Sequence, residues 1–313
     1  MGGGGSVFGG GYTPDKYKEI IQKTRMETRD AQFETTVNDM INERLSEYQR
    51  DTEKTQERLI EVKEILEEEE IGTIDMRFGG SVMKHTYVDG LSDVDVLVLL
   101  NKTELSEASP HEALEYIAER LGEEGGSDIE EIHVGDMAVT IIYTDGQEIQ
   151  LLPAIKRGEG YKIPQREENR WSNVTRPDNF ASKLTEVNQQ NNGKVVPIIK
   201  IAKSIISQLP EDQQLSGYHV ESIAIEVFKS YPESLPKTPK MMLRYFFEHA
   251  KDVVRSPIKD KTNQSVHVDD YLGQENSPKR VRVSYALDRI GRRMKNADEI
   301  GSVEEWESIL GEE

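Results

Sequence analysis

Apolar residues along this chain change their spacing twice, and these changes divide the chain into three parts. In the first part they recur at intervals of three and four residues, which predicts a long helix from Pro14 and then a second helix. The residues that form these two helical stripes are Ile20, Ile21, Phe33, Val37, Met40, Ile41 and Leu45, and then Leu59, Val62, Ile65 and Leu66.

The middle of the chain has the spacing of β-strands. Five strands are predicted by short apolar or alternating runs at 73–79, 94–100, 129–134, 137–143 and 148–152. The second of these runs is almost unbroken, as in a strand that is buried on both faces. A polar helix is expected between the second and third strands, at about 110–122.

After residue 153 the strand signals mostly stop and helical spacing returns. Helices are expected at about 178–191, 194–208, 217–230, 239–254 and 281–296. The whole pattern predicts an α+β fold with a mixed sheet, a long N-terminal helix behind the sheet and a helical C-terminal lobe. We therefore expect a flexible glycine-rich arm at 1–13, a core with the N-terminal helices at 14–155, and the helical lobe at 156–313.

Composition narrows the classes of function. The 313 residues include no cysteine, which excludes a disulfide scaffold, a thiolate zinc site and a cysteine nucleophile. The formal net charge is −19, which disfavours a general binder of long nucleic acid because such proteins need basic stripes. No apolar run approaches 18 residues and the start has no secretory signal, so we expect a cytoplasmic protein without a membrane span.

The candidate chemistry lies between the first two predicted strands. A turn with Gly80 and Ser81 ends one strand, and Asp93 and Asp95 stand at the start of the next. Alternation along a strand places both carboxylates on one face, where they repel unless a cation lies between them. Mg²⁺ takes oxygen ligands, and a glycine-serine turn offers backbone N–H groups to a phosphate. The alternative is that the two acids are merely solvated at the tip of a buried strand.

The surrounding motifs favour the catalytic interpretation through a resemblance to a known family. The segments GGS at 79–81, GLSDVDVLV at 90–98 and LLPA at 151–154 resemble the polymerase-β-like nucleotidyltransferases. The closer resemblance is to the CD-NTases, the cyclic-oligonucleotide synthases of anti-phage (CBASS) operons. The helical half resembles the same family in FASKLTEVNQ at 180–189, VVPIIKIAKSI at 195–205, LSGYHVESIAIE at 215–226 and VDDYLG at 268–273.

This resemblance implies an enzyme that joins NTPs, ATP among them, into a cyclic di- or trinucleotide second messenger and releases pyrophosphate. It implies two Mg²⁺ ions, with Mn²⁺ as an alternative, a downstream effector activated by the cyclic nucleotide, and regulatory partners from the same operon. Lys200, on an otherwise apolar helix, is expected to contact the triphosphate, with Lys203 as the second candidate. Ser216 is expected to cap the following helix and, by resemblance, to contact the same phosphates.

One position departs from the family pattern. The family has a third carboxylate three residues before the proline of the LLPA-like strand, and here that residue is Gln150. Glu148 lies two residues earlier on the same strand face. Either Glu148 serves as the third catalytic and metal-binding carboxylate, or that group is missing. The first alternative is favoured because Asp93, Asp95 and the glycine-serine turn are all present.

Two other functions remain open at this point. A template-independent RNA or tRNA nucleotidyltransferase would need a basic surface, and the patch of Arg289, Arg292, Arg293 and Lys295 is the one candidate that the sequence offers. A non-catalytic nucleotide-binding sensor is favoured by Gln150 and opposed by the intact pair of aspartates. Assaying the protein with the four NTPs, with and without RNA, separates these alternatives.

Overall fold

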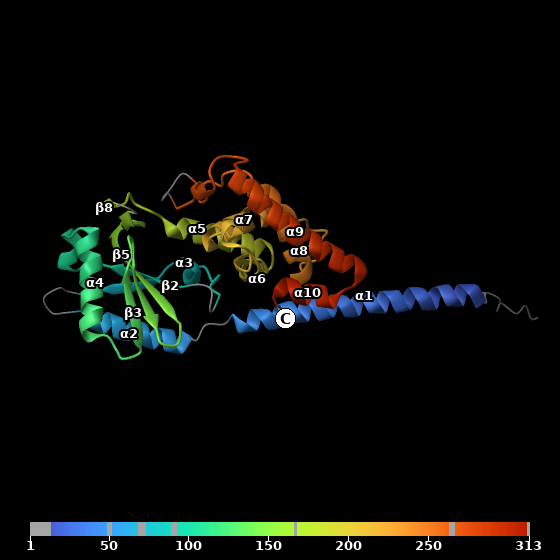
Figure 1. Ribbon diagram of the computed structural model, residues 1–313, viewed down its shortest axis with the longest axis horizontal. Helices are drawn as coiled ribbons and strands as arrows, with labels where there is room; N and C mark the ends of the chain where they lie inside the picture. Colours follow the sequence, from blue (N-terminus) through green and yellow to red (C-terminus); the bar gives the residue numbers. More distant parts are fainter. Residues whose placement is uncertain are drawn as a thin grey trace, which may run out of the picture.

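The chain folds into a sheet lobe and a helical lobe, with one long helix running beneath the helical lobe and projecting beyond it (Figure 1). The computed structural model describes residues 14–48, 52–67, 73–88, 93–165, 168–262 and 267–311. The glycine-rich arm expected at 1–13 lies outside these residues. Within the described chain, no helix is both long and apolar enough to cross a membrane.

The sheet lobe is built on a mixed sheet in which five strands follow the order β1-β2-β5-β4-β3. The bounds of these strands are Asp75–Phe78 for β1, Val94–Leu99 for β2, Ile129–Val134 for β3, Val139–Tyr143 for β4 and Glu148–Arg157 for β5. Strands β2 and β5 are parallel, and the other neighbours in this order are antiparallel. This arrangement confirms the predicted mixed sheet and α+β class.

Two helices cover one face of the sheet, α2 (Thr52–Leu66) and α4 (Pro110–Glu124), as Figure 1 shows. Val94, Val96 and Val98 of β2 pack with apolar residues of both helices in one buried cluster. Alternation therefore directs the side chains of Asp93 and Asp95 to the opposite face. That face carries the short helix α3 (Gly80–Met83), which the sequence pattern did not predict.

The strands extend further along the chain than the sequence predicted. β5 continues to Arg157, and three short strands follow: β6 (Gly160–Lys162), β7 (Pro164–Gln165) and β8 (Glu168–Trp171). The expectation that strand structure mostly ends at residue 153 is wrong. Segments of two to four residues are too short to show a period, so their pairing appears only in the folded chain.

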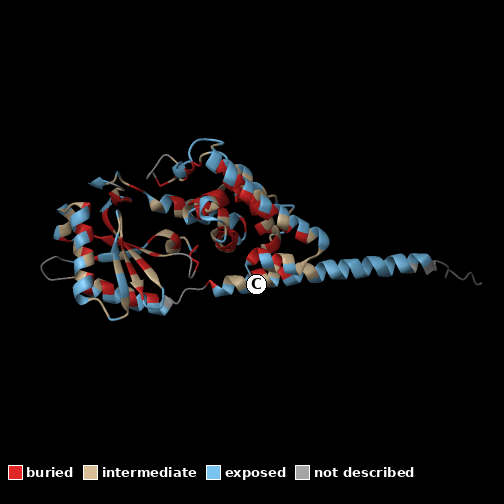
Figure 2. Ribbon diagram, in the orientation of Figure 1, coloured by how far each residue is buried: buried red, intermediate tan, exposed pale blue. Residues whose placement is uncertain are grey.

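The helical lobe begins after this region and has its own core. Its helices are α5 (Pro177–Gln190), α6 (Val195–Ser207), α7 (Gly217–Phe228), α8 (Pro239–Val253), α9 (Pro278–Ile300) and α10 (Val303–Leu310). The first five correspond to predicted helices, whereas α10 was not predicted. Figure 2 shows the buried residues of this lobe concentrated where these helices face one another.

Helix α1 (Pro14–Glu47) packs against the helical lobe. Its buried side chains Val37 and Ile41 belong to the same apolar cluster as α6, α8 and α10. The sequence grouped this helix with the core at 14–155, but the packing joins it to the C-terminal helices. Its first half projects past the lobe and is exposed (Figure 2). Periodicity shows that a helix has an apolar stripe, but it does not show which partner covers that stripe.

Candidate active site

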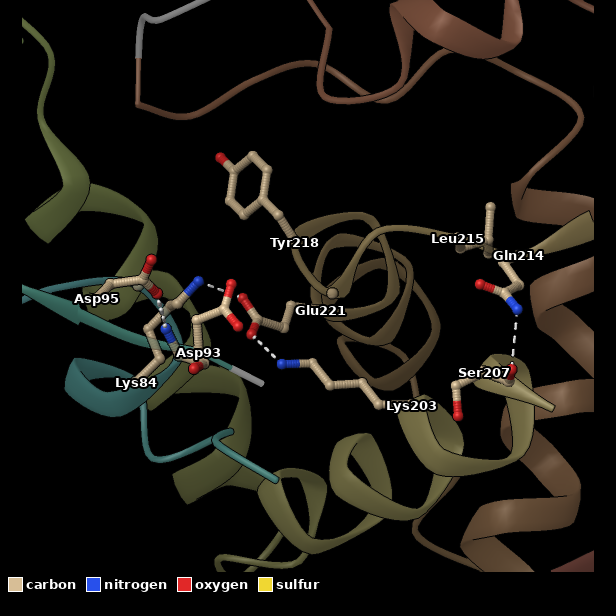
Figure 3. Close-up of a pocket in the computed structure, with 12 residues that line it drawn as sticks. Lys84, Asp93, Asp95, Lys203, Ser207, Gln214, Leu215, Tyr218 and Glu221 are labelled. Atoms are coloured by element: carbon tan, nitrogen blue, oxygen red, sulfur yellow. Dashed lines mark hydrogen bonds and ion pairs between the residues drawn. The ribbon is translucent and has the colours of Figure 1, made fainter. Parts of the chain in front are cut away.

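A cavity of about 350 Å³ lies where the two lobes meet, on the face of the sheet that α2 and α4 leave open (Figure 3). Among the residues that line it, the sheet lobe contributes Gly80, Ser81, Lys84, Asp93 and Asp95. The helical lobe contributes Lys203, Gln214, Tyr218 and Glu221, among others. Five residues predicted from the sequence are therefore brought together in one cavity: Gly80, Ser81, Asp93, Asp95 and Lys203.

The two aspartates lie on the same face of β2, as predicted. Asp93 directly precedes the strand and Asp95 is its second residue, and both side chains are half-buried. Val94 and Val96 between and after them are buried on the opposite side. The apolar residues fix the strand in the core, and this fixes the direction in which the carboxylates point.

The glycine-serine turn holds Asp95 directly. The backbone N–H of Gly79 donates to the Asp95 carbonyl at 2.8 Å, and that of Ser81 donates to Asp95 Oδ2 at 3.3 Å. Gly80 has φ +43°, and a Cβ at this position would lie 1.5 Å from Asp95 Oδ2. Only glycine permits so close an approach between the turn and the carboxylate.

The carboxyl groups are crowded, and their pKa values reflect it. Burial, the neighbouring Glu148 carboxylate and Asp95 together raise the pKa of Asp93 to about 6. Burial raises the pKa of Asp95 as well, opposed by the Ser81 N–H and by Lys84 and Lys203. The negative charge of this cluster is thus only partly compensated by the protein, and a divalent cation is the natural counter-charge for it.

Gln150 occupies the position at which the family that the sequence resembles has its third carboxylate, and Glu148 lies two residues before it. In the parallel pair of β2 and β5, Gln150 lies opposite Asp95, and its Nε2 donates to Asp93 Oδ2 at 2.5 Å. Gln150 therefore orients Asp93, while Glu148 reaches Asp93 from two residues earlier on β5. The catalytic role of Glu148 stays a prediction. Among the described residues, no three acidic or histidine side chains form a complete metal-binding set.

A buried cationic cluster faces the aspartates across the cavity. Lys84 Nζ donates to Glu221 Oε2 at 2.5 Å, and Lys203 Nζ donates to Glu221 Oε1 at 2.8 Å (Figure 3). Two ammonium groups share one carboxylate, so the cluster has an excess positive charge. The sequence analysis named Lys203 but missed Lys84 and Glu221. The available signal was Glu221, an acid with apolar residues around it on the largely apolar helix α7.

The other two predicted phosphate contacts lie differently. Lys200 is half-buried one turn earlier on α6 and is not among the residues that line the cavity, whereas Lys203 lines it. The contact of Lys200 with a triphosphate stays a prediction. Ser216 caps α7, as predicted: its Oγ accepts from the His219 N–H at 3.3 Å. Its neighbours Leu215 and Gly217 line the cavity, and Ser216 itself does not.

A second hollow of about 350 Å³ adjoins the first and shares Gly80, Lys84, Asp95 and Tyr218 with it. Its other walls are mainly apolar and include Phe78, Leu97, Leu152, Tyr161 and Phe180. Polar groups on one side and aromatic or aliphatic walls on the other suit a nucleoside bearing phosphates. The Asp95 carboxylate thus lies between two spaces, each large enough for a small molecule.

The comparisons with known proteins agree with this geometry. The family model of the Second Messenger Oligonucleotide or Dinucleotide Synthetase domain (SMODS) matches residues 26–188, just over half of the chain. No curated protein matches the sequence with significance.

Solved structures show the same fold at low sequence identity. CdnG of Bradyrhizobium diazoefficiens, a CD-NTase solved with GTP, has a TM-score of 0.65 and 12% identity, over 88% of this chain and 94% of that one. CdnC of E. coli MS115-1, solved with ATP, has a TM-score of 0.62 and 15% identity, over 83% and 91%. The Vibrio cholerae cyclic AMP-GMP synthase DncV, solved with the linear intermediate pppA(3′,5′)pG, has a TM-score of 0.60 and 9% identity, over 96% and 90%.

Proposed function

The chain belongs to the second-messenger oligonucleotide or dinucleotide synthetase family and is a nucleotidyltransferase, and on this basis we propose that it converts NTPs, ATP among them, into a cyclic di- or trinucleotide in a Mg²⁺-dependent reaction. One observation carries the proposal. The Asp93–Asp95 pair, fixed by the glycine-serine turn, lines a cavity between the lobes together with Lys84 beside it and Lys203 from the opposite lobe. Carboxylates for a metal and ammonium groups for phosphates are the two requirements of phosphoryl transfer.

The residues present fit a divalent cation. Asp93 and Asp95 supply oxygen ligands on one strand face, and their crowding leaves negative charge that the protein does not neutralise. Mg²⁺ is usually held by one or two carboxylates together with substrate phosphates, so this pair suffices. When bound, the cations would lower the pKa of the attacking hydroxyl and neutralise charge on the phosphates. Asp93 and Asp95 would hold them, and Glu148, which contacts Asp93, would join as the third ligand after a small shift toward the pair.

The protein's own groups position the substrates for one bond exchange. A ribose hydroxyl oxygen of the acceptor bonds to the α-phosphorus of the donor, the bond to pyrophosphate breaks, and the hydroxyl proton leaves to Glu148 or through it to solvent. Lys203 binds the polyphosphate, with the backbone N–H groups of Gly80 and Ser81 beside the reacting phosphate. Gln150 keeps the Asp93 carboxylate oriented by donating a hydrogen bond to it.

Two adjoining hollows support the joining of two nucleotides. Both contain Asp95 in their walls, so a donor in one and an acceptor in the other would meet at the carboxylates. A second transfer within the same cleft would close the ring. The anti-phage role, the cyclic-nucleotide-activated effector, the regulatory operon partners and the cytoplasmic location belong to the proposal through the family resemblance.

Nothing in the described surface favours the RNA-processing alternative. Acids lie beside the basic patch on α9: Arg292 pairs with Asp288, and Arg293 Nε lies 2.6 Å from Glu305 Oε1. These carboxylates reduce the positive potential that an RNA backbone would meet there.

The proposal is tested by incubating the full chain with the four NTPs and Mg²⁺, with and without RNA, and identifying products by mass spectrometry. We expect cyclic oligonucleotides that resist phosphatase, in amounts independent of RNA. Extension of the RNA would support the alternative activity instead. Nucleotide binding without any product would identify the chain as a sensor and overturn the proposal.

A further inference from the structure

Glu221 is one of the most deeply buried acids of the described chain, with 1% of its surface exposed. Both of its oxygens are occupied. Oε2 accepts from Lys84, and Oε1 accepts from Lys203 and from the Thr86 hydroxyl at 2.5 Å. A carboxylate buried to this extent is costly unless every lone pair is engaged, and here the three donors engage it.

The groups around Glu221 come from both lobes. Lys84 and Thr86 follow the glycine-serine turn of the sheet lobe, whereas Lys203 lies on α6 and Glu221 on α7 of the helical lobe. Lys203 Nζ also donates to the Thr86 carbonyl at 3.0 Å. A single carboxylate therefore fixes the distance between the lobes at the floor of the cavity.

The same contacts direct both ammonium groups toward the cavity, which both lysines line (Figure 3). Gly217, at the start of α7, leaves the room that Lys203 needs, because a Cβ there would lie 3.2 Å from Lys203 Cε. Two cations on one anion give this wall of the cavity a charge of +1. The excess faces the region beside Ser81 where a polyphosphate would lie.

We propose that Glu221 is a positioning residue, which holds Lys84 and Lys203 from opposite lobes so that both bind the polyphosphate of one NTP. The inference rests on the proposed function, because it deepens the substrate recognition of the same cavity. It adds Lys84 as a phosphate ligand and gives Glu221 a role without direct contact to the substrate.

The charge of Glu221, and not only its shape, is required by this arrangement. Burial lowers the pKa of the Lys203 ammonium, and the Glu221 carboxylate opposes that shift. Burial raises the pKa of Glu221 itself, but the two lysines outweigh it and hold that pKa below its usual value. A neutral glutamine could accept hydrogen bonds only at its single carbonyl oxygen, and its NH₂ group would face a lysine donor. It would also leave two like charges buried side by side.

The experiment compares Glu221→Gln, Glu221→Asp and the wild type as full chains. Binding of inorganic tripolyphosphate, which has no base or ribose, is measured by calorimetry without divalent cations. We expect Glu221→Gln to lower the affinity at least ten-fold and Glu221→Asp to restore it to within about three-fold of the wild type. The matched control is Asp298→Asn, because Asp298 also pairs with two cations, Lys240 and Arg244, but lies away from the cavity.

The control separates positioning from stability. We expect Asp298→Asn to lower the melting temperature and leave tripolyphosphate affinity unchanged. Equal affinity in Glu221→Gln and the wild type would overturn the inference while leaving the proposed function in place. Absence of nucleotide products from a wild type that binds tripolyphosphate would instead remove the proposed function.

A second variant decides the question if Glu221→Gln does not fold. Thr86→Val removes one hydrogen-bond donor to Glu221 Oε1. It nearly keeps the volume of the side chain and changes the charge of no residue. Thr86 is not among the residues lining the cavity, so its hydroxyl can act on the phosphate only through the Glu221–Lys203 pair, to both of which it is hydrogen-bonded. We expect a three- to ten-fold lower tripolyphosphate affinity in this variant, and unchanged affinity would overturn the inference.

Discussion

Gly80→Ala is the change that most sharply tests how the glycine-serine turn holds the Asp95 carboxylate, to which we assign a catalytic role. The added Cβ would lie 1.5 Å from Asp95 Oδ2, whereas real Cβ contacts are essentially never under 3.0 Å. The added Cβ and Asp95 Oδ2 must therefore separate by at least about 1.5 Å. That movement breaks the hydrogen bond from the Ser81 N–H to Asp95 Oδ2. Displacing a reacting or metal-holding group by about 1 Å can cost on the order of 10²-fold in rate, so we expect at least that loss in kcat.

Backbone strain adds a smaller and separable effect. Gly80 has φ +43°, a left-handed conformation that costs an alanine roughly 1–2 kcal/mol. Gly193 is the matched control because it has φ +76° and no atom within 4 Å of an added Cβ. Gly193→Ala should lose a similar free energy of unfolding and keep the wild-type rate.

The assay follows pyrophosphate release at saturating NTP, together with urea unfolding of both variants. Gly80→Ala should be inactive yet folded at the assay temperature, and Gly193→Ala active and slightly less stable. If the two variants lose activity in parallel with stability, the turn acts only on folding. If Gly80→Ala turns over like the wild type, Asp95 is not held where the reaction needs it.

Three further predictions concern single side chains. Lys203→Ala should raise the KM for ATP about ten-fold or more while Lys200→Ala leaves it unchanged, because only the first side chain lines the cavity; the reverse order in steady-state kinetics would restore the original sequence-based expectation. Glu148→Gln should slow turnover on the order of 10²-fold and Gln150→Ala much less, since only the glutamate can accept a proton; equal rates for Glu148→Gln and the wild type would remove its role. Burial lowers the pKa of His219, so the unfolded chain binds a proton near pH 6.5 that the folded chain excludes, and the free energy of unfolding should fall as the pH drops below about 6.5. His219→Gln should flatten this part of the stability profile measured by urea unfolding, and an unaltered slope would show that other groups cause it.

The sequence predicted those parts of the site that depend on local pattern. The unbroken apolar run of β2 identified a strand buried on both faces, and alternation alone placed Asp93 and Asp95 on one side of it. Ser216 was recognised as a cap because a serine before a helical stripe satisfies the first N–H groups of that helix. These inferences need no knowledge of what lies across the cleft.

The parts that the sequence left open or missed depend on how elements are rotated and which partners they pack against. Lys200 and Lys203 lie on one helix, and choosing between them requires knowing which face of α6 meets the sheet lobe. Two of the three partners of Glu221, Lys84 and Thr86, lie 137 and 135 residues away in sequence, so the buried cluster appears only after folding. Helix α10, with its short stripe of Trp306, Ile309 and Leu310, was missed because two turns give too few residues to define a period.

The central claim is that the cavity beside Asp93 and Asp95 is where NTPs react, and one structure tests it most directly. The full chain would be crystallised with Mg²⁺ and a non-hydrolysable ATP analogue. We expect carboxylate oxygens of both aspartates about 2.1 Å from Mg²⁺, and the polyphosphate between Ser81 and Lys203. A nucleotide bound outside this cavity, or cations held by phosphates while both carboxylates face away, would contradict the account.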